Sequence, residues 1–183
     1  MTRPARILFV EPSPYPSYGG SKRVLVHLAS GLDRARFDPV VLCYRAGPWS
    51  DELSRHGVPV RIADTLAADE KAGESQLGTP RWIGVGQTET GDFAWSPPRW
   101  FLRELRMTAR LEWTDRAASR RLDAWVPDGV DLVHINGAMH TDYAWYHLAR
   151  RRGLPFVIHE HGVLEDARGR VAPRRARRRR CYA

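Results

Sequence analysis

The stretch that decides the fold is residues 6–32, RILFVEPSPYPSYGGSKRVLVHLASGL. It begins with a short, continuous apolar run from Ile7 to Val10, which is typical of a parallel strand buried on both faces. A turn-rich segment with three prolines then leads to Gly19-Gly20. Apolar residues recur at helical spacing from Val24 to Leu32. A strand, a glycine-terminated loop and a helix are therefore predicted in this order.

The same alternation continues through the rest of the chain. Strands are predicted at 40–44, 58–63, 130–135 and 156–158, and helices at 50–57, 100–126 and 141–152. We expect Ser50 to be the N-cap of the second helix, and Trp100, Trp113 and Trp125 to lie in the core. This order predicts an α/β fold, a Rossmann-like α/β/α sandwich with a mostly parallel sheet and right-handed crossovers.

The length of 183 residues suits a single α/β domain, which we place at 1–165. Within it, residues 64–98 have no clear period and are expected to form a long loop or insertion. Residues 166–183 form an arginine-rich tail that contains eight arginines between positions 168 and 180. These eight arginines account for the whole net charge of +8, since the other 21 basic residues equal the 21 acidic residues in number. The tail is either a solvated, disordered end or a contact for nucleic acid or anionic lipid.

Other composition features exclude several classes of protein. The two cysteines give neither a disulfide framework nor metal-ligand spacing. The apolar run near the N-terminus is too short for a signal peptide or a membrane span. A cytoplasmic location is therefore expected, with contact to the inner face of the membrane through the arginine tail as a further interpretation.

Ligands bind at the carboxyl ends of the strands in an open parallel sheet, and the first such end here precedes Gly19 and Gly20. Glycine allows close approach of the backbone, and the N–H groups at a helix start attract anions such as a diphosphate. Lys22 and Arg23 would add positive charge. The alternative interpretation is an ordinary turn before a helix.

Two further strand ends carry polar side chains. Asn136, Gly137 and His140 follow one strand, where they either contact sugar hydroxyls or form a turn. The last strand continues into His159-Glu160-His161-Gly162, whose side chains either bind and activate a hydroxyl group or cap the strand. His159 and His161 share a face, but no further ligand follows at metal spacing, so no metal is expected.

Three segments together resemble the N-terminal domain of the retaining GT-B glycosyltransferases of family 4. These are the opening strand with Gly19-Gly20, the run DLVHIN at 131–136, and the run GLPFVIHEHG at 153–162. The resemblance implies transfer of a sugar from a nucleotide-sugar donor to an acceptor with retention of configuration. It implies neither an obligatory metal nor a cofactor, because the nucleotide sugar is a co-substrate.

The resemblance also implies roles for individual residues. His161 would be the catalytic residue, beside the reacting sugar. The residues implied in substrate binding are Gly19, Gly20, Lys22, Arg23, Asn136, His140 and Glu160. The acceptor would be a carbohydrate, a lipid-linked group or a small molecule.

The chain departs from the family in one respect, since it leaves no sequence for the second domain that holds most donor contacts. We therefore expect a fragment, a truncated or frameshifted product, or half of a split enzyme that pairs with a C-terminal GT-B domain and is inactive alone. The alternative function is a non-catalytic, Rossmann-like binding module whose arginine tail binds polyanions.

Overall fold

The computed structural model describes residues 3–13, 16–66, 106, 109, 112–136 and 142–159. The described strands form one sheet in the order β3-β2-β1-β4-β5, and every pairing is parallel. The strands are β1 (Ala5–Glu11), β2 (Phe37–Cys43), β3 (Val60–Ile62), β4 (Val130–Asn136) and β5 (Phe156–His159). The predicted order of strands and the parallel α/β fold are confirmed.

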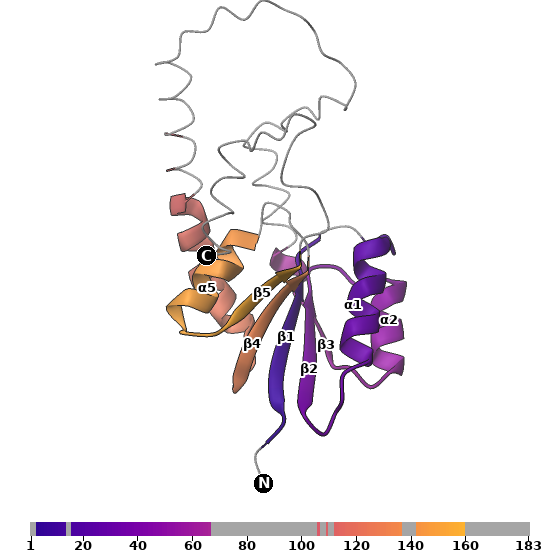
Figure 1. Cartoon of the computed structure of the whole chain (residues 1–183). Helices are drawn as coiled ribbons and strands as arrows, with labels where there is room; N and C mark the ends of the chain where they lie inside the picture. The colour runs from indigo at the N-terminus through magenta and orange to yellow at the C-terminus, as the bar shows by residue number, and fades with distance from the viewer. Residues whose placement is uncertain are drawn as a thin grey trace, which may run out of the picture.

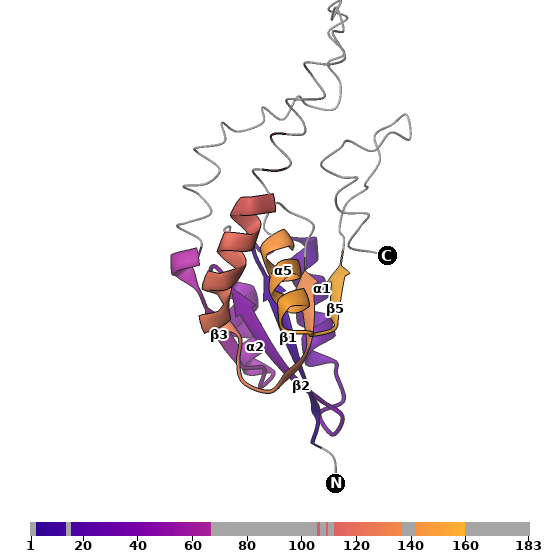
Figure 2. The same ribbon diagram turned by 90° about the vertical axis from the view of Figure 1, so that its left-hand side faces the viewer.

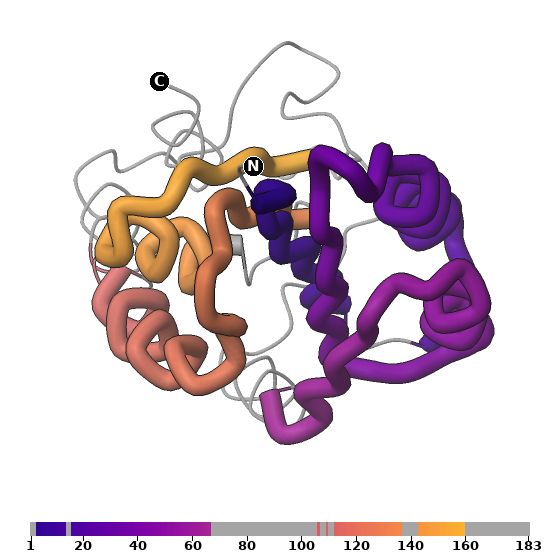
Figure 3. Tube along the Cα trace, turned by 90° about the horizontal axis from the view of Figure 1, so that it is seen from below, coloured from indigo at the N-terminus to yellow at the C-terminus, as the bar shows by residue number. Residues whose placement is uncertain are grey.

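Helices cover both faces of this sheet (Figures 1 and 3). One face carries α1 (Gly20–Ser30) and α2 (Pro48–Arg55). The other carries a helix at 112–121, the 3-10 turn η1 (Leu122–Trp125) and α5 (Asp142–Arg151), which lies in front of the sheet in Figure 2. The result is the expected three-layer α/β/α sandwich.

The alternation of side chains along the strands divides the core in two. Phe9 packs with Leu25 and Trp49 beneath α1 and α2. On the opposite face Leu8 and Val10 pack in the cluster that contains Trp145 of α5. The runs of apolar residues therefore form strands that are buried on both faces, as parallel strands require.

Two local predictions are wrong. Ser50 is not the N-cap of α2, because the helix begins at Pro48 and Gly47 is the capping residue. Proline suits the first helical turn, and the Ser50 hydroxyl instead accepts the Gly47 N–H at 3.0 Å. Trp113 is 74% exposed rather than part of the core. Trp125 does pack against the core on the α5 face.

The structure describes only part of the remaining predicted segments. The predicted helix at 100–126 is described from 112 onward, and its last turn tightens into η1. Residues 64–66 of the predicted loop are helical, and 67–98 lie outside the described residues, as do Trp100 and the tail at 166–183. None of the helices in the described part of the chain is long and apolar enough to cross a membrane.

Candidate functional site

The neighbouring strands β1 and β4 form the switch point of the sheet. The chain leaves β1 toward α1 on one face and leaves β4 toward α5 on the other. Open α/β sheets bind ligands outside the carboxyl ends of such a strand pair. We call the residues gathered there the switch-point site: Glu11, Gly19 to Lys22, and Asn136. Three of the sequence-predicted binding residues, together with Asn136, thus meet at one edge.

A buried hydrogen-bonded pair occupies the centre of this site. The Asn136 side-chain amide donates to Glu11 Oε2 at 2.6 Å and to the Ser21 carbonyl at 3.3 Å. The Ser13 backbone N–H donates to Glu11 Oε1 at 3.2 Å. Glu11 is 2% exposed and Asn136 1% exposed. Burial raises the pKa of Glu11, while the Asn136 hydrogen bond and the charge of Lys22 oppose that rise.

The two cations after the glycine pair face in different directions. Lys22 is 3% exposed, and its ammonium lies 5.6 Å from the centre of the Trp49 ring. Burial lowers the pKa of Lys22, and the nearby Glu11 carboxylate partly restores it. Arg23 is exposed, with its guanidinium 5.6 Å from the centre of the Tyr18 ring. Arg23 therefore presents its positive charge at the surface, whereas the positive charge of Lys22 lies in the interior, where it compensates the Glu11 carboxylate.

The loop before α1 is held by the start of α2. The Tyr18 hydroxyl donates to Glu52 Oε2 at 2.5 Å, and this hydrogen bond raises the pKa of Tyr18. A Cβ atom on Gly47 would stand 2.5 Å from the Pro16 carbonyl oxygen and 3.0 Å from Trp49 Nε1. Only glycine lets the two loops approach so closely, so the position of the Gly19-Gly20 turn depends on α2.

The part of the chain that the structure describes does not require glycine at Gly19 or Gly20. Gly19 is the N-cap of α1 with φ −84° and ψ −179°, an extended conformation that other residues adopt. Gly20 does not have a positive φ either. Among the described residues, leaving aside the adjacent residues and the backbone of α1 itself, no heavy atom lies within 4 Å of the position that a Cβ would take on either residue. The described part of the chain therefore does not fill the space in front of the helix start.

The third strand end reaches the same edge. In the sheet, Asn136 of β4 is paired with His159, the last residue of β5. The His159 ring lies 5.9 Å from the ring of His134, which in turn contacts Phe9. The other predicted side chains at these strand ends lie outside the described residues: Gly137, His140, Glu160 and His161.

Cys43, at the end of β2, adjoins the switch-point site. It pairs with Glu11 in the sheet register and is a buried free thiol. Burial, together with the Glu11 charge, raises its pKa to about 12, so the thiolate form is suppressed at neutral pH. Among the described residues, no group of three or more His, Cys, Asp or Glu side chains is arranged to hold a metal ion.

Sequence reasoning missed Glu11 and Tyr18. A signal for Glu11 was present, because a carboxylate ends an otherwise apolar run at the carboxyl end of a buried strand. Tyr18 offered no such signal, since its contact with Glu52 joins two loops that only the fold brings together. The switch-point site and the loop beside it therefore contain polar side chains that the glycine pair alone did not indicate.

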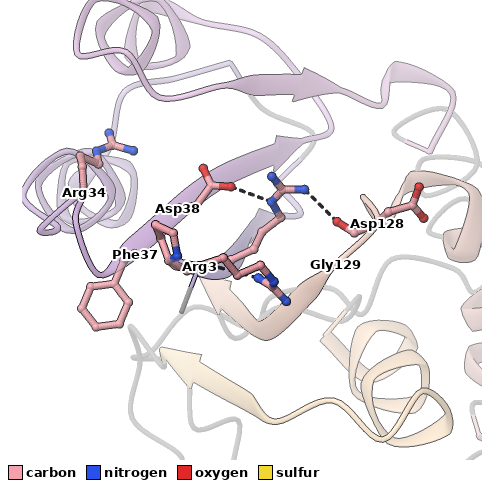
Figure 4. Close-up of a pocket in the computed structure, with 8 residues that line it drawn as sticks. Arg3, Arg34, Phe37, Asp38, Asp128 and Gly129 are labelled. Carbon is pink, nitrogen blue, oxygen red and sulfur yellow. Dashed lines mark hydrogen bonds and ion pairs between the residues drawn. The ribbon is translucent and has the colours of Figure 1, made fainter. Parts of the chain in front are cut away.

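The amino edge of the same strands carries a different kind of cluster (Figure 4). Arg3 donates two hydrogen bonds to Asp131, at 2.7 and 2.8 Å, and the Arg6 N–H donates to the same carboxylate at 2.7 Å. Arg6 also pairs with Asp38 at 2.7 Å beside an open pocket of about 460 Å³ that includes Arg34. Arginine and aspartate neutralise one another here, so this pocket presents no strong net charge to a ligand.

Comparison with known proteins finds solved structures and a family model that resemble the chain. Solved structures that resemble the chain include HepE of Anabaena in complex with UDP and glucose, with 18% identity and a TM-score of 0.43 over 87% of this chain and 30% of that one. Another is a glycosyltransferase from Rickettsia africae, with 14% identity and a TM-score of 0.47 over 90% and 32% of the two chains. The chain thus spans about a third or less of the length of either protein.

No curated protein matches the chain. A family model, however, matches residues 19–183, which is most of the sequence. That model describes the glycosyl transferase 4-like domain, and it begins at the first glycine of the switch-point site. The chain therefore belongs to the family of glycosyl transferase 4-like domains, and its fold is Rossmann-like.

Proposed function

We propose that the chain is the acceptor-side half of a glycosyltransferase that uses a nucleotide-sugar donor, with the donor diphosphate at the start of α1. The observation that carries this proposal is the unexplained glycine pair. Neither the backbone conformation nor packing against the described residues requires Gly19 or Gly20, and both positions are exposed there. A ligand that approaches the backbone closely explains why side chains are excluded there.

The chemistry of the helix start suits a diphosphate. The first N–H groups of a helix have no partner within the helix, and the helix dipole places partial positive charge there. Arg23 adds a surface guanidinium beside Tyr18. Lys22 acts from behind the turn, because it is buried against Glu11 and Trp49.

The remaining roles in this proposal rest on the family resemblance. We assign His161 to catalysis beside the reacting sugar, and Asn136, His140 and Glu160 to the acceptor side. The pairing of Asn136 with His159 supports this assignment, since β5 ends at the same edge two residues before His161. The acceptor is a carbohydrate, a lipid-linked group or a small molecule, and no cofactor takes part.

Most contacts with the nucleotide come from a second Rossmann-like domain in this proposal. HepE, with which this chain shares a fold, was solved with UDP and glucose, and this chain covers 30% of it. The 183-residue chain alone is then expected to bind UDP weakly and to catalyse no sugar transfer.

A titration with UDP tests the proposal. We expect UDP to shift the backbone amide resonances of Gly20 and Ser21 in the 183-residue chain. Gly20→Asp places a carboxylate against the diphosphate and is expected to weaken binding at least about tenfold, which corresponds to ~1.4 kcal/mol. Ala117→Asp adds the same charge at an exposed position of the helix at 112–121, on the other face of the sheet, and serves as the control. If UDP shifts no resonance at the start of α1, or if Gly20→Asp binds UDP as the wild type does, the proposal fails.

The arginine tail favours a second candidate function, polyanion binding. Eight arginines lie between positions 168 and 180 without a compensating acid. Binding of this kind weakens steeply with salt, because each phosphate contact releases counterions. Deletion from Arg168 onward should abolish binding to anionic vesicles or nucleic acid while UDP binding persists. A tail-deleted chain that keeps its polyanion affinity would exclude this function.

A further inference from the structure

The Glu11 carboxylate has no part in the function proposed above, yet it lies at the centre of the switch-point site. It follows the apolar run Ile7 to Val10 and is 2% exposed. A buried carboxylate loses its hydration and regains only part of that free energy from its partners. An apolar residue at the end of a buried strand would avoid this cost, so the carboxylate requires an explanation beyond packing.

The hydrogen bonds of Glu11 form a chain that ends at α1. An ionised carboxylate only accepts hydrogen bonds, so it fixes which end of the Asn136 amide faces β1. The amide nitrogen then has one hydrogen for Glu11 Oε2 and one for the Ser21 carbonyl. Ser21 belongs to the first turn of α1, whose first helical hydrogen bond runs from the Arg23 N–H to the Gly19 carbonyl at 3.2 Å. The orientation of one amide thus connects the end of β1 to the turn that carries the glycine pair.

One charged neighbour favours the ionised form of the carboxylate, against the burial that raises its pKa. Lys22 faces Glu11 from α1, and Cys43 faces it from β2 as a protonated thiol. The side chain that β4 contributes is the neutral amide of Asn136. The single nearby positive charge among these groups is therefore that of Lys22, which compensates Glu11 inside the protein.

We propose that Glu11 is a positioning residue, whose carboxylate orients the Asn136 amide and through it the first turn of α1, so that this turn is ordered for an anionic ligand. Glu11 itself is too deeply buried to touch the ligand. Its consequence for ligand binding rests on the function proposed above. Its effect on the order of the turn is independent of any ligand.

A double variant in which the carboxylate and the amide swap positions distinguishes two roles of Glu11: positioning of the first turn of α1, and a simple link between β1 and β4. In the double variant Glu11→Gln/Asn136→Asp, a carboxylate and an amide still hydrogen-bond between β1 and β4, and the charge of the pair is unchanged. The carboxylate at position 136 has no hydrogen to donate to the Ser21 carbonyl. If Glu11 only links the strands, the double variant should behave like the wild type. If Glu11 positions the first turn of α1, the double variant should not.

The first readout needs no ligand. We expect amide hydrogen exchange of Arg23 to accelerate about tenfold in Glu11→Gln and in the double variant, relative to wild type. Exchange of the amides in the helix at 112–121 should stay unchanged, and the double variant should recover the melting temperature. Asp131→Asn is the matched control, because Asp131 also bridges β1 and β4 but at the amino edge. The double variant keeps the test valid if Glu11→Gln does not fold.

The second readout is the affinity for UDP, which should fall about tenfold in Glu11→Gln and in the double variant. Wild-type exchange at Arg23 in both variants would overturn the role of Glu11, whether or not UDP binds. Recovery of wild-type exchange by the double variant would also overturn it, because strand linking alone would then suffice. If exchange accelerates as expected but the wild-type chain binds no UDP, the glycosyltransferase proposal fails and the positioning role of Glu11 stands.

Discussion

The two ends of the β1–β4 strand pair are each bridged by a carboxylate, but in opposite ways. At the amino edge, Asp131 accepts the Arg6 N–H, and its side chain is 39% exposed beside Arg3. At the carboxyl edge, Glu11 is buried and its pKa is raised by burial, whereas Arg3 lowers the pKa of Asp131. An exposed carboxylate therefore suffices to join these strands. Burial of the Glu11 carboxylate costs free energy, which indicates that this carboxylate does more than join the two strands.

Removal of the Glu11 partner should produce the largest difference between the two edges. Asn136→Leu leaves a buried carboxylate without its main hydrogen-bond donor, and we expect a loss of about 3 kcal/mol in the free energy of unfolding. Asp131→Leu should cost clearly less, because water solvates the Arg3 group that it leaves behind. Urea denaturation measures both values. Equal losses would mean that the two edges serve the same structural purpose.

A second comparison concerns glycines within the carboxyl edge itself. Gly47→Ala forces a Cβ against the Pro16 carbonyl and should destabilise the fold by about 2 kcal/mol. Gly20→Ala meets no atom, and alanine favours the helix, so this variant should be neutral or more stable by about 0.5 kcal/mol. Thermal denaturation distinguishes them. A destabilised Gly20→Ala would show that the fold, rather than a ligand, requires glycine there.

The smallest effect is the pH dependence of stability, which should have opposite signs at the two edges. The pKa of Glu11 is raised above 4.5 in the fold, so the folded protein binds a proton before the unfolded chain does, and this group adds stability as the pH falls. The pKa of Asp131 is lowered below 3.8, so its contribution is present above that value and is lost as the pH falls through the folded pKa.

Paired denaturation curves between pH 3 and pH 7 check these signs, about the range over which such carboxylates titrate. The difference between wild type and Glu11→Gln should shift in favour of the wild type at acid pH. The difference between wild type and Asp131→Asn should shift the other way. The same sign for both variants would contradict the contrast between a buried and an exposed carboxylate.

The sequence predicted the parts of this fold that follow from short-range patterns. Continuous apolar runs indicated the buried strands, and the glycine pair indicated the helix start. The contact between Glu11 and Asn136 joins residues 125 positions apart, and no local pattern contains it. The pKa shifts likewise follow from burial at Glu11 and from a hydrogen bond at Asp131, and only the packed structure determines either.

For Lys22 and Arg23, the sequence-based prediction was correct for the charge but did not distinguish the buried residue from the exposed one. Both were predicted to add positive charge at the helix start, although Lys22 precedes Leu25 by three residues and Ala29 by seven, and so lies on the buried stripe of α1. Helical spacing alone could have shown that Lys22 is buried and Arg23 is exposed. The N-cap of α2 was harder, because Gly47 is selected by its contact with the Pro16 carbonyl rather than by capping chemistry.

The close approach of Gly47 to Pro16, together with the Tyr18–Glu52 hydrogen bond, makes the loop before α1 and the start of α2 one unit of local unfolding. Fraying of α2 would loosen that loop even though no residue of α2 is proposed to touch a ligand. Substitutions on α2 can then change the affinity of the anion-binding turn from a distance. This makes the second β–α unit a place where affinity can be adjusted while the binding groups stay the same.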